Sequence, residues 1–382
     1  MAPSTSVLEQ PWPEQQRSRA TAIPSSSGLR CRGPEKLWFE RRPMRTPIVL
    51  STSPAGVVLP IHRTATDLPP HELRFFEPGS RELTDHIAEA DFVLGDWTGT
   101  TRLDAKALHA ARHCRLIVQP TAGHDSIDTE TAAALGIPVA NIPGANARAV
   151  SEWTVMAMLM LAKNVVRNHH RTADGEWPMV EAAAEGVRDL ADCTVGIVGL
   201  GRIGRNVARL LHAFGVEPIH YWHRRPVAPD PTAPATLEYV PDLDDLLTRC
   251  EIVTLHIPLT PDTRGLIDSR RLRLLGPAGV LINTARGGIV DETALHTALR
   301  NREIKAAALD VFSQEPPPTI TRWSTLDNVL LSPHLAGSTI EARHAMVRRA
   351  LTALAEGLRG ELPASVVNGV TALRSANVPG RY

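Results

Sequence analysis

The chain has 382 residues, of which 43% are hydrophobic and 21% are charged, proportions of a globular protein with room for two full cores. Its formal net charge is zero, so the molecule as a whole has no electrostatic preference for nucleic acid or an anionic membrane, and we expect neither as a partner. The four cysteines show neither CxxC pairing nor metal-ligand spacing, which predicts reduced thiols, no metal site and a cytoplasmic location.

Residues 1–45 differ in composition from the rest of the chain. They are rich in Pro, Ser and Arg and show no hydrophobic periodicity, which predicts a disordered N-terminal extension. The arginines and serines weakly resemble an organelle transit peptide, but Glu9 and Glu14 argue against that interpretation. We also expect residues 371–382 to form a flexible tail.

A first α/β unit is predicted from about residue 46. Short apolar runs indicate its strands and amphipathic spacing indicates its helices. The predicted strands are 47–50, 91–95 and 116–119, and the predicted helices lie around 80–90 and 103–112.

The longest apolar run extends from Ala149 to Ala162. Glu152 interrupts this run, which is also too short to span a bilayer. We therefore expect a buried helix at about 148–163, followed by a loop around Asp174 and Gly175.

The second unit opens with TVGIVGLGRIGRNVARLL at 194–211. A β-branched run typical of a buried parallel strand leads into Gly199, Gly201 and Gly204, and an amphipathic helix pattern follows. The glycines permit a tight turn and let backbone amides approach a pyrophosphate at the positive end of the helix. Because the GxGxxG lies between a strand and a helix, it predicts a dinucleotide site rather than a glycine-rich turn without a ligand.

Strands and helices alternate through the rest of this unit, which predicts a parallel sheet with right-handed crossovers. Ligands of such sheets bind at the carboxyl ends of the strands. Apolar runs end at residues 199, 256, 284, 312 and 331, helical patterns lie near 242–250, 268–275 and 291–301, and a long helical pattern covers 342–358.

Three residues that follow these strands have the chemistry for hydride transfer to a carbonyl, which needs a substrate anchor, a polarising group and a proton source. Arg286 offers a fixed cation for a carboxylate and the adjacent carbonyl oxygen. His334 offers an imidazole, which can give or take a proton near neutral pH. Glu315 can pair with that imidazole and fix its tautomer. Each also has an ordinary explanation, as a turn cap, a packed histidine or a solvated turn residue, but their joint occurrence favours a catalytic site.

The combined motifs resemble those of the D-isomer-specific 2-hydroxyacid dehydrogenase family, which includes phosphoglycerate dehydrogenases and glyoxylate and hydroxypyruvate reductases. The likeness extends over roughly residues 47–370. The matching segments are AGHDSID (122–128), LGIPVANIPG (135–144), VGIVGLGRIG (195–204), HIPLTPDTRGLID (256–268), LINTARGGIVDETAL (281–295), AALDVFSQEP (307–316) and SPHLAGST (332–339).

This resemblance implies an α/β fold of two doubly wound parallel-sheet, Rossmann-like domains. A dinucleotide-binding domain at 148–334 would be inserted into a discontinuous substrate domain, made of 46–147 and 335–370. It also implies a homodimer through the apolar helix at 148–163.

The resemblance further implies roles for individual residues. Arg286, Glu315 and His334 would be catalytic, and the backbone amides of Ala122 and Gly123 would hold the substrate carboxylate together with Arg286. Cofactor contacts would come from Gly199, Gly201, Arg202, Ile203, Gly204, His223, Arg224, Arg225, Pro258, Thr284, Asp310 and Gly337, with Arg202 and Ile203 at the pyrophosphate, and Thr284 and Asp310 at the nicotinamide, Asp310 near its carboxamide.

One segment departs from the family pattern. NAD-binding members carry an acidic residue after the second strand to hold the ribose hydroxyls. Here the stretch reads IHYWHRR at 219–225, and neither Trp222 nor His223 is acidic. Arg224 and Arg225 can receive a 2′-phosphate, so we predict NADP in preference to NAD. The alternative is that both arginines are solvated and NAD is held by backbone groups alone.

The sequence thus predicts an oxidoreductase that reduces a small 2-oxo acid to the D-2-hydroxy acid. One alternative is formate or phosphite oxidation on the same scaffold, and another is a non-catalytic dinucleotide sensor like the dehydrogenase-related corepressors. Asp96, Trp97 and Thr98 follow an early strand and are candidates for lining the substrate pocket, although ordinary packing of Trp97 is an equal alternative.

Overall fold

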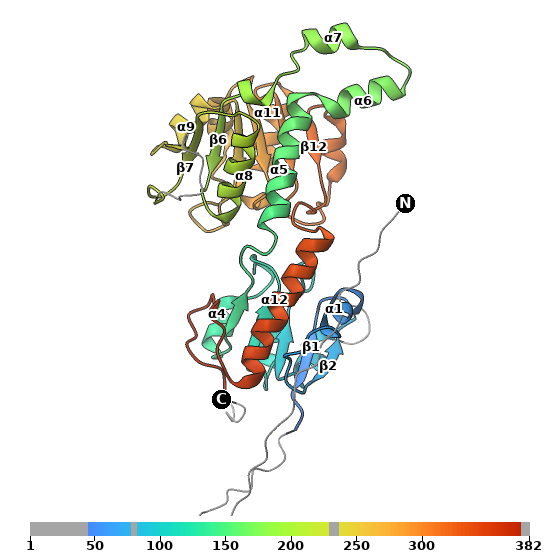
Figure 1. Cartoon of the computed structure of the whole chain (residues 1–382), viewed down its shortest axis with the longest axis vertical. Coiled ribbons are helices and arrows are strands. Elements are labelled where there is room, and N and C mark those ends of the chain that lie inside the picture. Colours follow the sequence, from blue (N-terminus) through green and yellow to red (C-terminus); the bar gives the residue numbers. More distant parts are fainter. Residues whose placement is uncertain (1–44, 78–81, 229–236, 376–382) are drawn as a thin grey trace, which may run out of the picture. The chain divides into compact units, whose positions relative to one another are not determined.

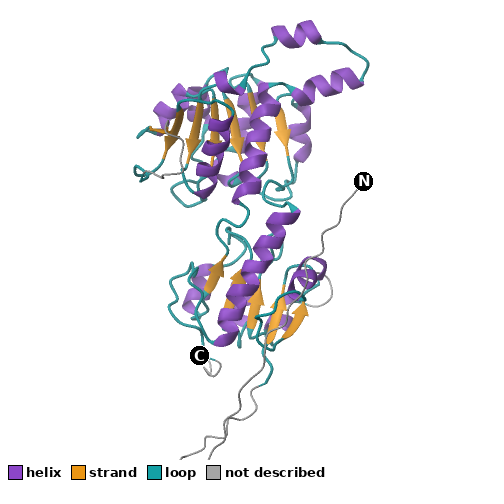
Figure 2. Cartoon of the chain, viewed as in Figure 1, coloured by secondary structure: helices purple, strands orange, loops and turns teal. Residues whose placement is uncertain are grey.

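The protein was analysed as a computed structural model that describes residues 45–77, 82–228 and 237–375. The predicted disordered extension, apart from its last residue, and most of the predicted flexible tail lie outside this part of the chain. Within it the chain forms two parallel β-sheets covered by helices (Figure 1, Figure 2). The predicted α/β fold with two Rossmann-like sheets is confirmed.

The first sheet has five strands in the order β2-β1-β3-β4-β5. β1, β3 and β4 are buried along their whole length, as expected for strands covered on both faces. The strands are β1 (Ile48–Ser51), β2 (Glu72–Phe75), β3 (Phe92–Leu94), β4 (Leu116–Gln119) and β5 (Val139–Asn141), and the helices among them are α1 (Ala55–His62), α2 (Leu83–Ile87), α3 (Ala105–Ala110) and α4 (Thr129–Ala134).

The C-terminal helix α12 (Ile340–Arg359) packs on this first sheet, far from it in sequence. Its buried residues Val347 and Leu351 belong to the same apolar core as Val49 of β1 and Phe92 of β3. Thr339 caps the helix by accepting a hydrogen bond from the Ala342 amide. The chain thus returns to its first sheet after the second, and the discontinuous substrate domain stays a prediction.

The second sheet has seven strands in the order β12-β11-β10-β9-β6-β7-β8. The order reverses at β6, which lies between β9 and β7, and ligands of such sheets bind at this reversal. The strands are β6 (Val195–Val198), β7 (Ile219–Trp222), β8 (Leu237–Tyr239), β9 (Ile252–Leu255), β10 (Val280–Asn283), β11 (Ala306–Leu309) and β12 (Val329–Leu331), and the helices are α8 (Arg202–Ala213), α9 (Leu243–Arg249), α10 (Ser269–Leu275) and α11 (Glu292–Arg300), with short 3-10 turns η1 (Leu190–Asp192), η2 (Gly287–Ile289) and η3 (Ile320–Thr325).

The predicted buried helix is α5 (Ala147–Ala162), which packs against α8, β10 and β11. Among the described helices, none is long and apolar enough by itself to cross a membrane; α5 and the following helix pass that test only as a pair bent by 59°. Cys114, Cys193 and Cys250 are buried free thiols, and Cys31 lies outside the described residues.

Two short helices, α6 (Val165–Ala173) and α7 (Met179–Ala184), follow α5 where the sequence predicts only a loop. Neither helix buries a single residue, and Figure 1 shows α7 standing away from the second sheet. We name residues 164–187 the arm. The arm thus lies largely at the surface, with Pro178 as its one buried residue.

Candidate active site

The glycine turn joins β6 to α8 at the reversal of the second sheet. Gly199 has a φ of 101°, and a side chain there would overlap the carbonyl of His256. A side chain at Gly204 would overlap the carbonyl of Gly199, so this glycine lets α8 pack closely on the strand. At Gly201, the N-cap of α8, nothing lies within 4 Å of the position of a side chain. The turn thus leaves open space at a helix N-terminus, which fits the phosphates of a dinucleotide.

The predicted cofactor residues all follow carboxyl ends of strands in this one sheet. His223 comes directly after β7, and its carbonyl accepts a hydrogen bond of 3.3 Å from the Tyr239 hydroxyl. The guanidinium groups of Arg224 and Arg225 are exposed and form no hydrogen bond or ion pair within the described chain. The others lie in the first turn of α8 (Arg202, Ile203), after β9 (Pro258), after β10 (Thr284), after β11 (Asp310) and after β12 (Gly337).

Two of these residues are engaged with α5. The Thr284 hydroxyl lies 3.3 Å from the hydroxyl of Thr154, and a side chain at Gly337 would overlap the side-chain nitrogen of Asn146, the N-cap of α5. Both contacts hold strand-end loops of the second sheet against this helix. Contact of Thr284 and Gly337 with a cofactor stays a prediction.

The predicted acid–base residues are in direct contact. Nδ1 of His334 lies 2.7 Å from Oε2 of Glu315, and Oε1 of Glu315 accepts a hydrogen bond of 2.9 Å from the Phe312 amide. Burial raises the pKa of the Glu315 carboxyl, but the hydrogen bonds from His334 and Phe312 and the charges of His334 and Arg286 outweigh it and lower that pKa. Glu315 is therefore an ionised acceptor, and Nε2 of His334 has no hydrogen-bond partner in the described part of the chain.

Asp310 fixes the loop that carries His334. The backbone of His334 adopts a φ of 55°, which is uncommon for a residue other than glycine. Its amide donates to the Asp310 carbonyl at 2.8 Å, and the amides of Leu335 and Ala336 donate to the Asp310 carboxylate at 2.8 and 3.0 Å. Burial raises the pKa of Asp310, despite hydrogen bonds that lower it. The role seen for Asp310 is thus to position the loop, and its predicted contact with the nicotinamide remains a prediction.

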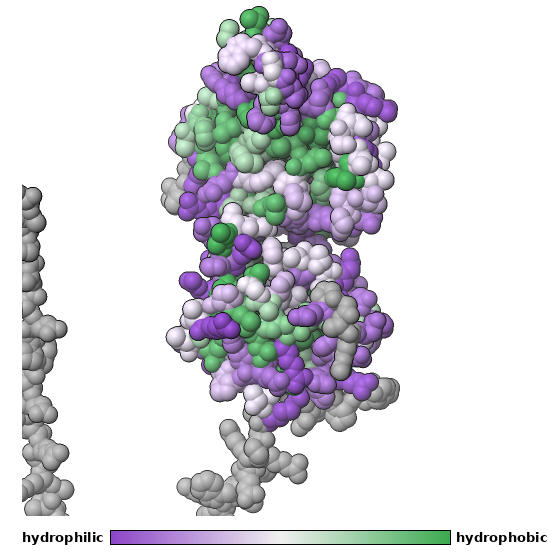
Figure 3. Space-filling model, turned by 90° about the vertical axis from the view of Figure 1, so that its right-hand side faces the viewer, coloured by the Kyte–Doolittle hydropathy of each residue, from purple (hydrophilic) through white to green (hydrophobic). Residues whose placement is uncertain are grey.

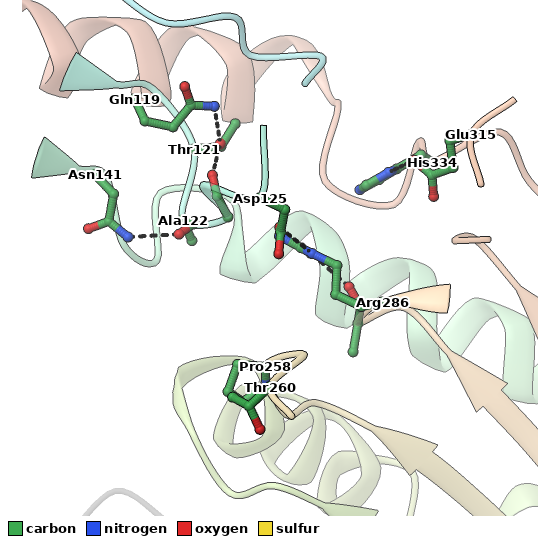
Figure 4. Close-up of polar contacts among 12 residues, drawn as sticks. Gln119, Thr121, Ala122, Asp125, Asn141, Pro258, Thr260, Arg286, Glu315 and His334 are labelled. Atoms are coloured by element: carbon green, nitrogen blue, oxygen red, sulfur yellow. Dashed lines mark hydrogen bonds and ion pairs between the residues drawn. The ribbon is translucent and has the colours of Figure 1, made fainter. Parts of the chain in front are cut away.

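Arg286 links the second sheet to a loop of the first. Its Nε donates a hydrogen bond of 2.8 Å to Oδ2 of Asp125, and its Nη1 donates to the carbonyl of Ala285 (Figure 4). A side chain at Gly123 would overlap its Nη2. Burial raises the pKa of Asp125, but the charge and hydrogen bond of Arg286 outweigh burial and lower it. The sequence reasoning missed Asp125, although it lies inside the AGHDSID segment.

The turn at Ala122 and Gly123 is held by its carbonyl groups. Asn141 donates to the Ala122 carbonyl at 2.7 Å, and the Thr121 hydroxyl donates to the Gly123 carbonyl at 2.7 Å (Figure 4). The amides of Ala122 and Gly123 donate no hydrogen bond to any described residue. Two unused amides beside a guanidinium can hold a carboxylate.

Comparisons with known proteins identify the family of this chain. The sequence model of the D-isomer specific 2-hydroxyacid dehydrogenase, NAD binding domain, matches residues 155–336. A glyoxylate reductase of Thermofilum pendens is 38% identical over 309 residues, which make up 79% of this chain and 88% of that protein. The chain belongs to the D-isomer-specific 2-hydroxyacid dehydrogenase family.

Solved structures share the fold. An NADPH-dependent glyoxylate/hydroxypyruvate reductase of Sinorhizobium meliloti, in complex with NADP and malonate, is 28% identical with a TM-score of 0.72, covering 87% of this chain and 99% of that one. An NAD-dependent formate dehydrogenase of Staphylococcus aureus, in complex with NAD, is 26% identical with the same TM-score, covering 83% of this chain and 96% of that one. The chain is therefore an oxidoreductase that uses a nicotinamide cofactor and acts on the CH–OH group of 2-hydroxy acids.

Proposed function

We propose that this dehydrogenase reduces small 2-oxo acids to D-2-hydroxy acids, with Arg286, Glu315 and His334 as its catalytic residues. The observation that carries the proposal is the His334–Glu315 hydrogen bond at 2.7 Å. It occupies Nδ1 of the imidazole and leaves Nε2 as the nitrogen available to a substrate. The names of the relatives favour glyoxylate and hydroxypyruvate as substrates.

Each residue has a separate task in this reaction. The amides of Ala122 and Gly123 and the Nη2 atom of Arg286 hold the substrate carboxylate. Nε2 of His334 gives its proton to the carbonyl oxygen as that oxygen becomes an alkoxide, and Glu315 keeps the imidazole oriented. When bound, the reduced nicotinamide supplies the hydride.

NADPH is the proposed cofactor. The segment 219–228 contains no carboxylate to repel a 2′-phosphate, and the guanidinium groups of Arg224 and Arg225 are exposed beside the end of β7. Comparing kcat/KM for NADPH and NADH tests this choice. Equal values, or NADH ahead, would defeat it.

A substrate panel tests the function itself. Glyoxylate, hydroxypyruvate, pyruvate and bulkier 2-oxo acids would be offered with NAD(P)H, and formate and phosphite with the oxidised cofactors, while the reduced nicotinamide absorbance is followed. Turnover of a 2-oxo acid supports the proposal. Turnover of formate or phosphite alone would replace it, and cofactor binding without any turnover would point to a dinucleotide sensor.

We further propose that the protein is a homodimer. Its interface would be formed by the predicted helix at 148–163 together with the arm. Trp177 and Val180 in the arm are 80% and 70% exposed, and exposed apolar groups of this size mark interaction surfaces. Figure 3 shows hydrophobic residues gathered on one face of the body that holds the second sheet. A hollow that includes Met158, Leu161 and Val280 lies in this body. Light scattering should give a dimer for the wild type and a monomer for Trp177→Asp combined with Val180→Glu; a monomeric wild type would refute the proposal.

A further inference from the structure

Helix α12 brings Arg343 to the carboxyl edge of the first sheet. Gly357, near the end of this helix, lies against Leu116 and Phe92, the first residues of β4 and β3. Arg343 precedes Gly357 by about four helical turns, or roughly 21 Å. The strands beneath span only about 10–13 Å, so the helix carries Arg343 past their full length to the edge where ligands bind.

Arg343 meets Trp97 there. The Arg343 guanidinium carbon lies 5.7 Å from the centre of the Trp97 ring, within the range of a cation–π interaction. The Trp97 backbone is fixed by a hydrogen bond of 3.1 Å from its amide to the Ser53 hydroxyl. Trp97 Nε1 and Arg343 Nε are both buried nitrogen atoms without a hydrogen-bond partner. Two buried donors are therefore left unsatisfied, which costs free energy unless a ligand accepts from them.

The neighbouring carboxylate of Asp96 is engaged by other donors. Asp96 accepts hydrogen bonds of 2.9 and 2.6 Å from the amide and hydroxyl of Thr98, of 2.8 Å from the Thr100 hydroxyl and of 2.9 Å from the Thr101 amide. These bonds use Asp96 to shape the turn after β3. Arg343 itself forms no ion pair with any residue that the structure describes.

Hydrogen bonds connect the backbone next to Trp97 to the turn at Ala122 and Gly123. Nε2 of Gln119 donates both to the Asp96 carbonyl and to the Thr121 hydroxyl, at 2.9 Å each. The Thr121 hydroxyl donates in turn to the Gly123 carbonyl at 2.7 Å, and Gly123 lies against Arg286. Three hydrogen bonds thus connect the backbone next to Trp97 to the groups proposed to hold the substrate carboxylate.

We propose that Trp97 and Arg343 determine substrate specificity by binding the group attached to the third carbon of the 2-oxo acid. The two donors select a substituent that accepts hydrogen bonds, a hydroxyl or a second carboxylate, over an alkyl group of the same size. This inference rests on the proposed function, because it assigns the remaining part of the same substrate site.

Hydroxypyruvate and 2-oxobutyrate test the assignment, because they differ only in a hydroxyl in place of a methyl group. The wild type should favour hydroxypyruvate by about 10²-fold or more in kcat/KM, since sites built around a substrate hydroxyl reject its analogue strongly. Arg343→Met should lower this ratio about 10-fold or more, and Trp97→Phe, which keeps an aromatic ring but removes the indole N–H, should lower it in the same direction.

Glyoxylate is the internal control, because it has no third carbon. Its kcat/KM should stay within a few-fold of wild type in both variants, and Arg349→Met, at an exposed position of the same helix, should change neither the ratio nor glyoxylate turnover. An unchanged ratio in Arg343→Met and Trp97→Phe, or an equal loss for all three substrates, would overturn the specificity proposal while leaving the proposed function intact. Absence of turnover with every 2-oxo acid in the wild type would instead overturn the proposed function.

Discussion

The side chain of Arg286 is held by Asp125, a residue 161 positions earlier in the chain, through a hydrogen bond of 2.8 Å from Nε to Oδ2. The bond ties the end of β10 to the loop after β4. Nη2 of the guanidinium lies against Gly123, in the turn proposed to hold the substrate carboxylate.

Removing this contact should impair catalysis through position alone. Asp125→Ala frees the guanidinium to change its orientation, and misplacement of a substrate-binding group by about 1 Å can cost 10²-fold. We expect kcat/KM for glyoxylate to fall about 10- to 100-fold, mainly through a higher KM, in steady-state assays. Asp67→Ala, at an exposed position of the first unit, is the control. Wild-type kinetics in Asp125→Ala would show that Arg286 needs no such support.

His334→Ala should lower kcat by about 10²–10⁴, the usual contribution of a general acid–base group. Glu315→Gln should lower it in the same direction but less, since the imidazole keeps its place while losing its ionised partner. His344→Ala, an exposed histidine of α12, should have no effect. Activity of His334→Ala within a few-fold of wild type would count against His334 as the proton donor.

The lowered pKa of Glu315 predicts how stability depends on pH. Burial raises this pKa, but the hydrogen bonds from His334 and Phe312 and the neighbouring charges lower it overall. The unfolded glutamate has a pKa of about 4.3, so the carboxylate stabilises the fold fully above that pH and loses this effect as the pH falls through the lower, folded value.

The difference in melting temperature between wild type and Glu315→Gln should therefore shrink as the pH is lowered from about 5 to about 3. Calorimetry across that range measures it. A difference that stays constant would mean that ionisation of Glu315 contributes nothing to stability.

The glycines of the nucleotide turn should separate folding from binding. A methyl group at Gly204 would overlap the Gly199 carbonyl, so Gly204→Ala should cost about 1–3 kcal/mol of stability, as overpacking does. The methyl group of Gly201→Ala would meet no protein atom, so this variant should lose much less stability. It should nevertheless weaken NADPH binding about 10-fold or more, because the methyl group would occupy the space proposed for the phosphates. Denaturant titration and calorimetric binding distinguish the two, and tight NADPH binding by Gly201→Ala would place the phosphates elsewhere.

Replacing the arginines after β7 should change the cofactor preference. Arg224→Ser combined with Arg225→Ser removes the two cations that can pair with a 2′-phosphate, and KM for NADPH should rise about 10- to 100-fold. KM for NADH should change less than about threefold, as should both values in Arg112→Ser, an exposed arginine of the first unit. A parallel rise for both cofactors would show that the arginines do not recognise the phosphate.

Burial explains which elements could be predicted from the sequence. β1, β3 and β4 are continuous apolar runs because both faces of each strand are covered. β2 and β8 form edges, and their residues are partly exposed, so Glu72–Phe75 and Leu237–Tyr239 carry no such run. β5 is only three residues long, α4 is a short Ala-rich helix, and α6 and α7 bury no residue; none of these four elements was predicted from the sequence.

Part of the candidate site could be predicted from the sequence. Strand-end positions could be read because parallel strands gather their carboxyl ends at one edge, and Glu315 and His334 do meet there. The Arg286–Asp125 contact joins two sheets, and neither hydrophobic period nor motif spacing carries information about such a pairing. The unsatisfied donors on Trp97 and Arg343 depend on where α12 returns to the first sheet, and no local sequence pattern encodes that position.

The attachment of the His334 loop to Asp310 has a consequence for protein engineering. The Asp310 carboxylate accepts hydrogen bonds from the main-chain N–H groups of residues 335 and 336. Every amino acid except proline supplies such a group. Leu335 points largely into solvent, at 54% exposure. A label, a bulky aromatic residue or a charged residue can therefore be introduced at position 335, next to the proposed proton donor. Such a substitution keeps the backbone hydrogen bonds that position His334.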